Sequence, residues 1–111
     1  MRPILSEQKL HPQVQNTIEA FHSEVVTEVD KAITQNEWVI VGMSGNPFVK
    51  RARKHLEKKG ISFKYIEYGS YFSKWHERLA IKLWSGWPTF PQVFHKGTLI
   101  GGFEDMKKYS P

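Results

Sequence analysis

Hydrophobic residues in the first third of the chain recur at steps of three and four. This spacing is the period of an amphipathic helix, which we expect to end at the polar pair Gln35–Asn36. Residues 1–12 lack the period and are expected to form a loose lead-in. The apolar positions of the predicted helix are Val14, Ile18, Phe21, Val25, Val29 and Ile33.

The rest of the chain predicts four strands and three further helices. Residues 37–43 form an apolar run rich in β-branched residues, which is typical of a buried strand. Asn46 and Pro47 suit the N-cap and the first position of a helix, and Gly60 suits its end. The remaining predicted elements are a strand over residues 61–68, a helix over about 72–84, a hairpin of 92–95 and 98–100 across Lys96–Gly97, and a short helix from about Phe103.

The order of these elements predicts the fold class. A strand, a helix and a strand in succession make a βαβ unit with parallel strands, and the closing hairpin adds antiparallel ones. We therefore expect an α/β fold with a four-stranded mixed sheet flanked by helices. Residues 1–35 are expected to hold the lead-in and an extra N-terminal helix, and residues 36–111 the α/β domain.

The chain of 111 residues has a formal net charge of +5, which favours acidic partners. Much of this charge lies in one block, which we interpret as a solvated helix face rather than a nucleic-acid surface, because no nucleic-acid motif accompanies it. No apolar run approaches the roughly 20 residues of a membrane helix, and the N-terminus lacks a signal-peptide core. We therefore expect a cytoplasmic protein with neither nucleic acid nor membrane as a partner. The basic block is Lys50, Arg51, Arg53, Lys54, Lys58 and Lys59.

The chain contains no cysteine. It therefore has no disulfide, no thiolate metal site and no thiol nucleophile. Its five histidines lack the spacing of a zinc-binding helix, so no metal site is expected. Ser44 and Ser73 have no evident base partner, which argues against a nucleophilic triad.

Three segments resemble one known family. Residues 39–53 (VIVGMSGNPFVKRAR) resemble the first strand, active-site turn and helix of glutaredoxins, where the turn reads C-P-Y-C or C-G-F-S. Residues 87–94 (WPTFPQVF) resemble the W-P-T-x-P-Q stretch of monothiol glutaredoxins, and residues 96–105 (KGTLIGGFED) resemble the family's hairpin and G-G-x-[DE]-D turn. The resemblance covers about residues 37–109 and implies a thioredoxin fold and glutathione as the ligand.

The active-site turn departs from this family. Asn46 stands where the family has its attacking cysteine, and Val49 where a second cysteine or a serine usually lies. Thiol–disulfide exchange needs a thiolate, and so does ligation of the iron–sulfur cluster that monothiol glutaredoxins bridge with glutathione. We therefore expect no disulfide reductase activity, no catalytic residue and no iron–sulfur cluster. The structural interpretation of Asn46 and Pro47 is that they begin a helix as its N-cap and first-turn proline. A weaker functional interpretation is that free backbone N–H groups at this helix start form an anion site.

The resemblance also implies a glutathione-binding groove. Its candidate residues are Asn46, Phe48, Arg78, Phe90, Pro91, Gly102, Phe103, Glu104 and Asp105. Phe90 would pair with the glutathione main chain before a cis Pro91, and residues 102–105 would hold the γ-glutamyl end. Arg78 would bind the glycyl carboxylate. The family's lysine before the active-site turn is missing, and Met43 occupies that neighbourhood.

Each of these residues also has a purely structural interpretation. Pro91 could simply start a strand, and acids in a first helical turn offset the helix dipole. Arg78 could be an exposed helix cation. Core packing would explain most of an aromatic-rich region, whose exposed part could be a partner surface. That region comprises Tyr68, Tyr71, Phe72, Trp75, Trp84 and Trp87.

We therefore expect a glutaredoxin-like protein that binds glutathione without catalysis, as a binding or regulatory member of a redox family with an unidentified protein partner. One alternative is a protein-interaction module that has lost glutathione as well. Another is an enzyme that activates the thiol of glutathione through a hydrogen bond from Asn46 or Ser44.

Overall fold

The computed structural model describes residues 22–109. The predicted lead-in and the helical positions Val14, Ile18 and Phe21 lie outside these residues. The elements in chain order are α2 (Ser23–Gln35), β1 (Trp38–Gly42), α3 (Pro47–Lys58), β2 (Lys64–Glu67), α4 (Trp75–Ser85), β3 (Gln92–His95), β4 (Thr98–Gly101) and α5 (Phe103–Lys108).

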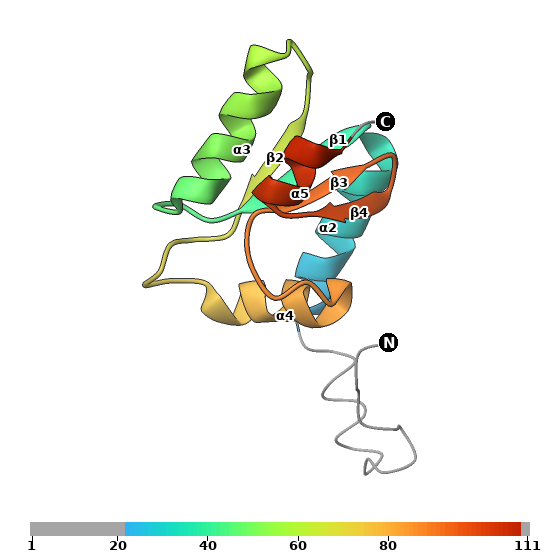
Figure 1. Ribbon diagram of the computed structural model, residues 1–111. Coiled ribbons are helices and arrows are strands. Elements are labelled where there is room, and N and C mark those ends of the chain that lie inside the picture. The colour runs from blue at the N-terminus through green and yellow to red at the C-terminus, as the bar shows by residue number, and fades with distance from the viewer. Residues whose placement is uncertain (1–21, 110–111) are drawn as a thin grey trace.

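The strands form one four-stranded sheet in the order β2-β1-β3-β4. β1 pairs in parallel with β2 and antiparallel with β3, and β3 pairs antiparallel with β4. This is the predicted βαβ unit followed by a hairpin, so the mixed α/β sheet is confirmed (Figure 1). The hairpin turns at Lys96 and Gly97, which both take positive φ, at 51° and 79°.

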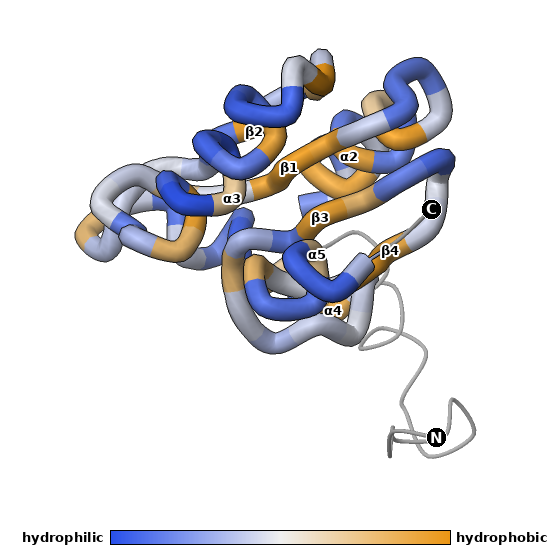
Figure 2. The backbone as a smooth tube through the Cα atoms, turned by 45° about the horizontal axis from the view of Figure 1, so that its top comes forward, coloured by the Kyte–Doolittle hydropathy of each residue, from blue (hydrophilic) through white to orange (hydrophobic). Residues whose placement is uncertain are grey.

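Two helices cover each face of the sheet. α2 packs against α4 and β1, whereas α3 packs against α5 and β1 (Figure 1). Alternate residues of β1 pack on opposite faces of the sheet. Val39 and Val41 lie in the cluster with α2 and α4, whereas Trp38 and Ile40 lie in the cluster with α3 and α5. β1 and β3 accordingly carry hydrophobic colours in Figure 2, while much of α3 is hydrophilic.

α2 shares the core of the α/β sheet. Its side chains Val25, Val29 and Ala32 are buried in the same cluster as Val39 and Phe94 of the strands. The hydroxyl of Tyr68, which follows β2, donates a hydrogen bond to the Glu28 carboxylate. Burial, together with this carboxylate, raises the pKa of Tyr68, so the phenol stays protonated.

Helix α4 begins later than the spacing of its apolar residues predicts. Ser70 and Ser73 form a hydrogen-bonded turn in which the Ser73 Oγ accepts from the Ser70 N–H at 3.1 Å. Lys74 then takes a left-handed conformation (φ 55°), and the helix starts at Trp75 rather than Phe72. Serine hydroxyls accept hydrogen bonds from backbone N–H groups in this turn, so these groups do not need helical partners. The spacing of apolar side chains carries no information about such bonds and therefore does not predict the turn.

Val29→Ala tests the contribution of α2 to the core. Val29 has no exposed surface, so removing two methyl groups should lower the free energy of unfolding by about 2 kcal/mol. The exposed Thr27→Ala on the same helix should change it by less than about 0.5 kcal/mol. Urea titrations of both variants provide the comparison. Equal stabilities would mean that α2 does not share the core.

Candidate functional site

The Asn46 side chain caps α3 at the end of β1. Its Oδ1 accepts hydrogen bonds from the N–H groups of Phe48 at 2.8 Å and Val49 at 3.1 Å. Pro47 has no N–H to offer, and the Lys50 N–H bonds to the Asn46 carbonyl at 3.2 Å. The predicted cap is confirmed. The predicted anion site at this helix start is wrong, because the Asn46 side chain and carbonyl already engage those N–H groups.

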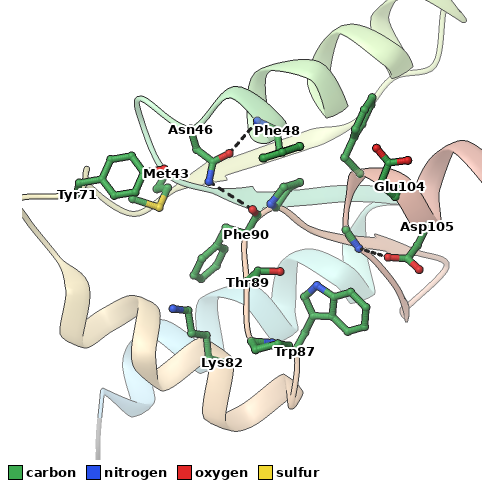
Figure 3. Close-up of a pocket in the computed structure, with 14 residues that line it drawn as sticks. Met43, Asn46, Phe48, Tyr71, Lys82, Trp87, Thr89, Phe90, Glu104 and Asp105 are labelled. Carbon is green, nitrogen blue, oxygen red and sulfur yellow. Dashed lines mark hydrogen bonds between the residues drawn. The ribbon is translucent and has the colours of Figure 1, made fainter.

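The same side chain also reaches the loop before β3. Its Nδ2 donates to the Phe90 carbonyl at 3.4 Å, and the Phe90–Pro91 peptide bond is cis, as expected. One carboxamide therefore joins two segments that are 44 residues apart in the chain (Figure 3).

A cavity of about 500 Å³ opens beside this contact. Eight of the nine predicted groove residues line it: Asn46, Phe48, Phe90, Pro91, Gly102, Phe103, Glu104 and Asp105. The other lining residues are Met43, Tyr71, Lys82, Trp87, Pro88 and Thr89. The turn after β1, the loop before β3 and the start of α5 thus converge on one pocket (Figure 3).

Two carboxylates of α5 lie on one side of this pocket. The Asp105 Oδ2 accepts from the Gly102 N–H at 3.0 Å, which orders the first turn of the helix. A Cβ at Gly101, where φ is 116°, would lie 2.6 Å from that oxygen, so this position requires glycine. Glu104 is exposed and pairs with Lys107 at 3.0 Å.

Lys82 of α4 faces the pocket. This residue was not predicted from the sequence. Its Nζ lies 5.6 Å from the centre of the Phe90 ring, across the pocket from the carboxylates of Glu104 and Asp105 (Figure 3). Lys82 follows Arg78 by four residues, which is one helical turn. This spacing was the available signal, once the helix had been placed.

Arg78 does not join the other candidates. Its side chain is buried, and its Nη1 donates to the carbonyls of Tyr68 at 2.9 Å and Ser73 at 2.6 Å. The guanidinium therefore holds the segment between β2 and α4 in place. The sequence analysis interpreted Arg78 either as a glutathione ligand or as an exposed helix cation. The structure instead buries Arg78 away from the pocket lining.

The wall of the pocket also contains an unused donor. The Trp87 Nε1–H is buried and has no hydrogen-bond partner among residues 22–109. The Trp87 carbonyl accepts from the Nε2 of the fully buried Gln92 at 3.0 Å, which fixes this loop against β3. Ser44, by contrast, lines a separate cleft between α3 and β2.

Within residues 22–109, no three His, Asp or Glu side chains are grouped so that they could hold a metal ion. No helix in this range is both long and apolar enough to cross a membrane.

Comparisons with known proteins agree with this architecture. A family model described as Glutaredoxin matches residues 39–100. A glutaredoxin-like protein of Dictyostelium discoideum is 53% identical over 95 residues, which cover 86% of this chain and 77% of that protein. Monothiol glutaredoxin-S17 of Arabidopsis thaliana is 35% identical over 88 residues, covering 72% of this chain but only 17% of the plant protein.

Solved structures share the fold. A crystal structure of a buckwheat glutaredoxin–glutathione complex has a TM-score of 0.69 at 20% identity, covering 81% of this chain and 82% of that one. The sheet order, the helices on both faces and the cis proline beside the helix N-terminus define a protein of the thioredoxin fold. Together with the family match, they show that the chain belongs to the glutaredoxin family. It is a member without any cysteine.

Arg78→Met and Lys82→Met form a matched pair on α4. Loss of the buried guanidinium leaves two carbonyls without their donor and should lower the free energy of unfolding by about 2 to 3 kcal/mol. Lys82→Met removes a half-buried pocket cation and should change stability by less than about 0.5 kcal/mol. Chemical denaturation of both variants measures the difference. Similar losses in the two variants would contradict the structural role of Arg78.

Proposed function

We propose that this protein binds glutathione reversibly in the pocket above Phe90–Pro91 and performs no thiol–disulfide exchange. The observation that supports this proposal is the pocket beside Asn46, whose carboxamide stands where the sequence resemblance puts the family's cysteine. The glutaredoxin of the same fold that is solved as a glutathione complex supports the class of ligand.

The charges around the pocket suit a small zwitterionic peptide. Lys82 supplies a cation on α4, and Glu104 and Asp105 supply carboxylates on α5, with the Phe90–Pro91 segment between them. A peptide ligand could place a carboxylate at one of its ends near Lys82. An ammonium group at its opposite end would then lie near Glu104 and Asp105, so both ends would meet a complementary charge. In this proposal Lys82 holds the carboxylate for which Arg78 was predicted, and it compensates for the absence of a lysine near Met43.

Polar groups in the pocket wall offer further contacts. The Trp87 Nε1–H would find an acceptor in an extended peptide ligand, and a buried donor without a partner gains most from such a bond. The main chain at Phe90 would pair with the ligand backbone. Its carbonyl is already the acceptor for Asn46 Nδ2, at a long 3.4 Å, so the ligand would share or displace this contact.

The absence of sulfur limits the chemistry to binding and orientation. A carboxamide cannot attack a disulfide, and it does not replace a thiolate in a cluster. Activation of the ligand's own thiol would depend on the second N–H of the Asn46 amide, because Ser44 lines the other cleft. We favour the binding role, since the N–H groups of Phe48 and Val49 are bonded to the Asn46 Oδ1 and are not free for a thiolate.

Titration of the full chain with reduced glutathione tests the proposal. Amide NMR shifts should concentrate at Asn46, Phe90 and Asp105. Lys82→Met should weaken the affinity roughly tenfold, or about 1.4 kcal/mol, by removing one charge-assisted contact. Lys58→Met at the far end of α3 serves as the control and should bind as the parent does. No shifts at millimolar glutathione would contradict the proposal and leave an interaction module.

Asn46→Cys tests whether only the thiol is missing. The parent protein should not reduce a glutathione mixed disulfide. The variant should do so, because the N–H groups of Phe48 and Val49 would then favour a thiolate at the helix start. Val49→Cys, at a buried position, is the matched control and should remain inactive. If Asn46→Cys binds glutathione but shows no exchange, the turn does not present its side chain as a glutaredoxin does.

A further inference from the structure

One face of α4 exposes large apolar side chains. Trp75, Leu79 and Leu83 follow one another at steps of four and are 57%, 38% and 60% exposed. Phe72, in the turn before the helix, is 97% exposed. We refer to these four residues as the α4 stripe. Residues at steps of four lie on one side of a helix, so the stripe is continuous over two turns.

The stripe is not part of the core. α4 buries its other side, through Arg78, Ala80 and Ile81. This side packs against α2, and Ile81 lies in the same core cluster as Val39 and Val41 of β1. A continuous exposed patch of large apolar side chains marks a surface that another segment or molecule covers.

The chain enters the described structure beside this patch. His22 precedes α2, its Nε2 lies 3.9 Å from the Glu77 carboxylate, and its ring stacks against His76 at 6.3 Å. His76 in turn lies 3.7 Å from the Trp75 ring, measured between ring centres. The residue that follows Phe21 therefore lies at the N-terminal end of the α4 stripe.

The backbone at His22 separates the preceding sequence from α2. His22 is left-handed (φ 44°, ψ 44°), and α2 begins only at Ser23. α2 therefore does not extend back beyond Ser23, and the predicted apolar positions Val14, Ile18 and Phe21 lie outside the described residues. Three apolar side chains in this preceding segment would gain from burial against an apolar surface.

We propose that residues 14–21 dock on the α4 stripe and cover it within the same chain. As a helix, the seven residue steps from Val14 to Phe21 would span about 10 Å, which is close to the roughly 12 Å of the eight steps from Trp75 to Leu83 on α4. The short connection through His22 gives the segment a millimolar effective concentration at the stripe, which a separate molecule lacks. A second copy of the chain and a different protein are the other possible occupants.

A single spin label tests this assignment directly, because the chain has no cysteine of its own. A nitroxide on Gln15→Cys in the full chain should remove most of the amide NMR intensity at Leu79 and Leu83. The amide of Lys58, on α3 at the opposite face of the sheet, should keep its intensity. Ile18→Glu in the labelled chain should restore the signals of the stripe, whereas Thr17→Glu should leave them broadened.

Mixed samples separate the occupants. Isotope-labelled protein without the nitroxide, mixed with unlabelled protein that carries it, should show no broadening at Leu79 and Leu83. Broadening there would identify a second copy and overturn the proposal. Unchanged signals at the stripe in the singly labelled chain would overturn it as well, and would leave the surface to another protein.

Discussion

Burial of β1 on both faces is the constraint on which the other elements depend. All five of its residues are buried, and their side chains alternate between the α2–α4 layer and the α3–α5 layer. A strand in this position fixes both helical layers and the register of both neighbouring strands. It also fixes the place of the turn that follows, and hence the end of the pocket where Asn46 lies.

Asn46 links secondary structure and site through a single side chain. Its carbonyl oxygen satisfies the first turn of α3, and its nitrogen contacts the loop that carries the cis proline. Asn46 is also the residue that the sequence resemblance matches to the family's cysteine, and its side chain stabilises the turn that carries it. Caps and turns, rather than sulfur, hold this pocket together.

Local chemistry explains why much of this structure could be predicted from the sequence. The Asn46–Pro47 helix start, the Lys96–Gly97 hairpin and the alternation in β1 each depend on neighbouring residues. Eight groove residues followed from the family resemblance, which placed them in the turn after β1, the loop before β3 and the start of α5. Arg78 and Lys82 did not, because the burial of one and the pocket position of the other depend on how α4 packs, which helical spacing does not specify. The start of α4 was missed because serine hydroxyls end the preceding turn.

The absence of a thiol also changes how occupancy of the pocket depends on the redox state of the cell. In a family member with a reactive cysteine, the ligand can become covalently attached, so occupancy depends on the balance of oxidised and reduced glutathione. Because this chain has no cysteine, no mixed disulfide forms on it and no thiol is available for oxidation. Under the proposed function, occupancy follows the concentration of glutathione alone, and the protein senses an amount rather than a redox potential.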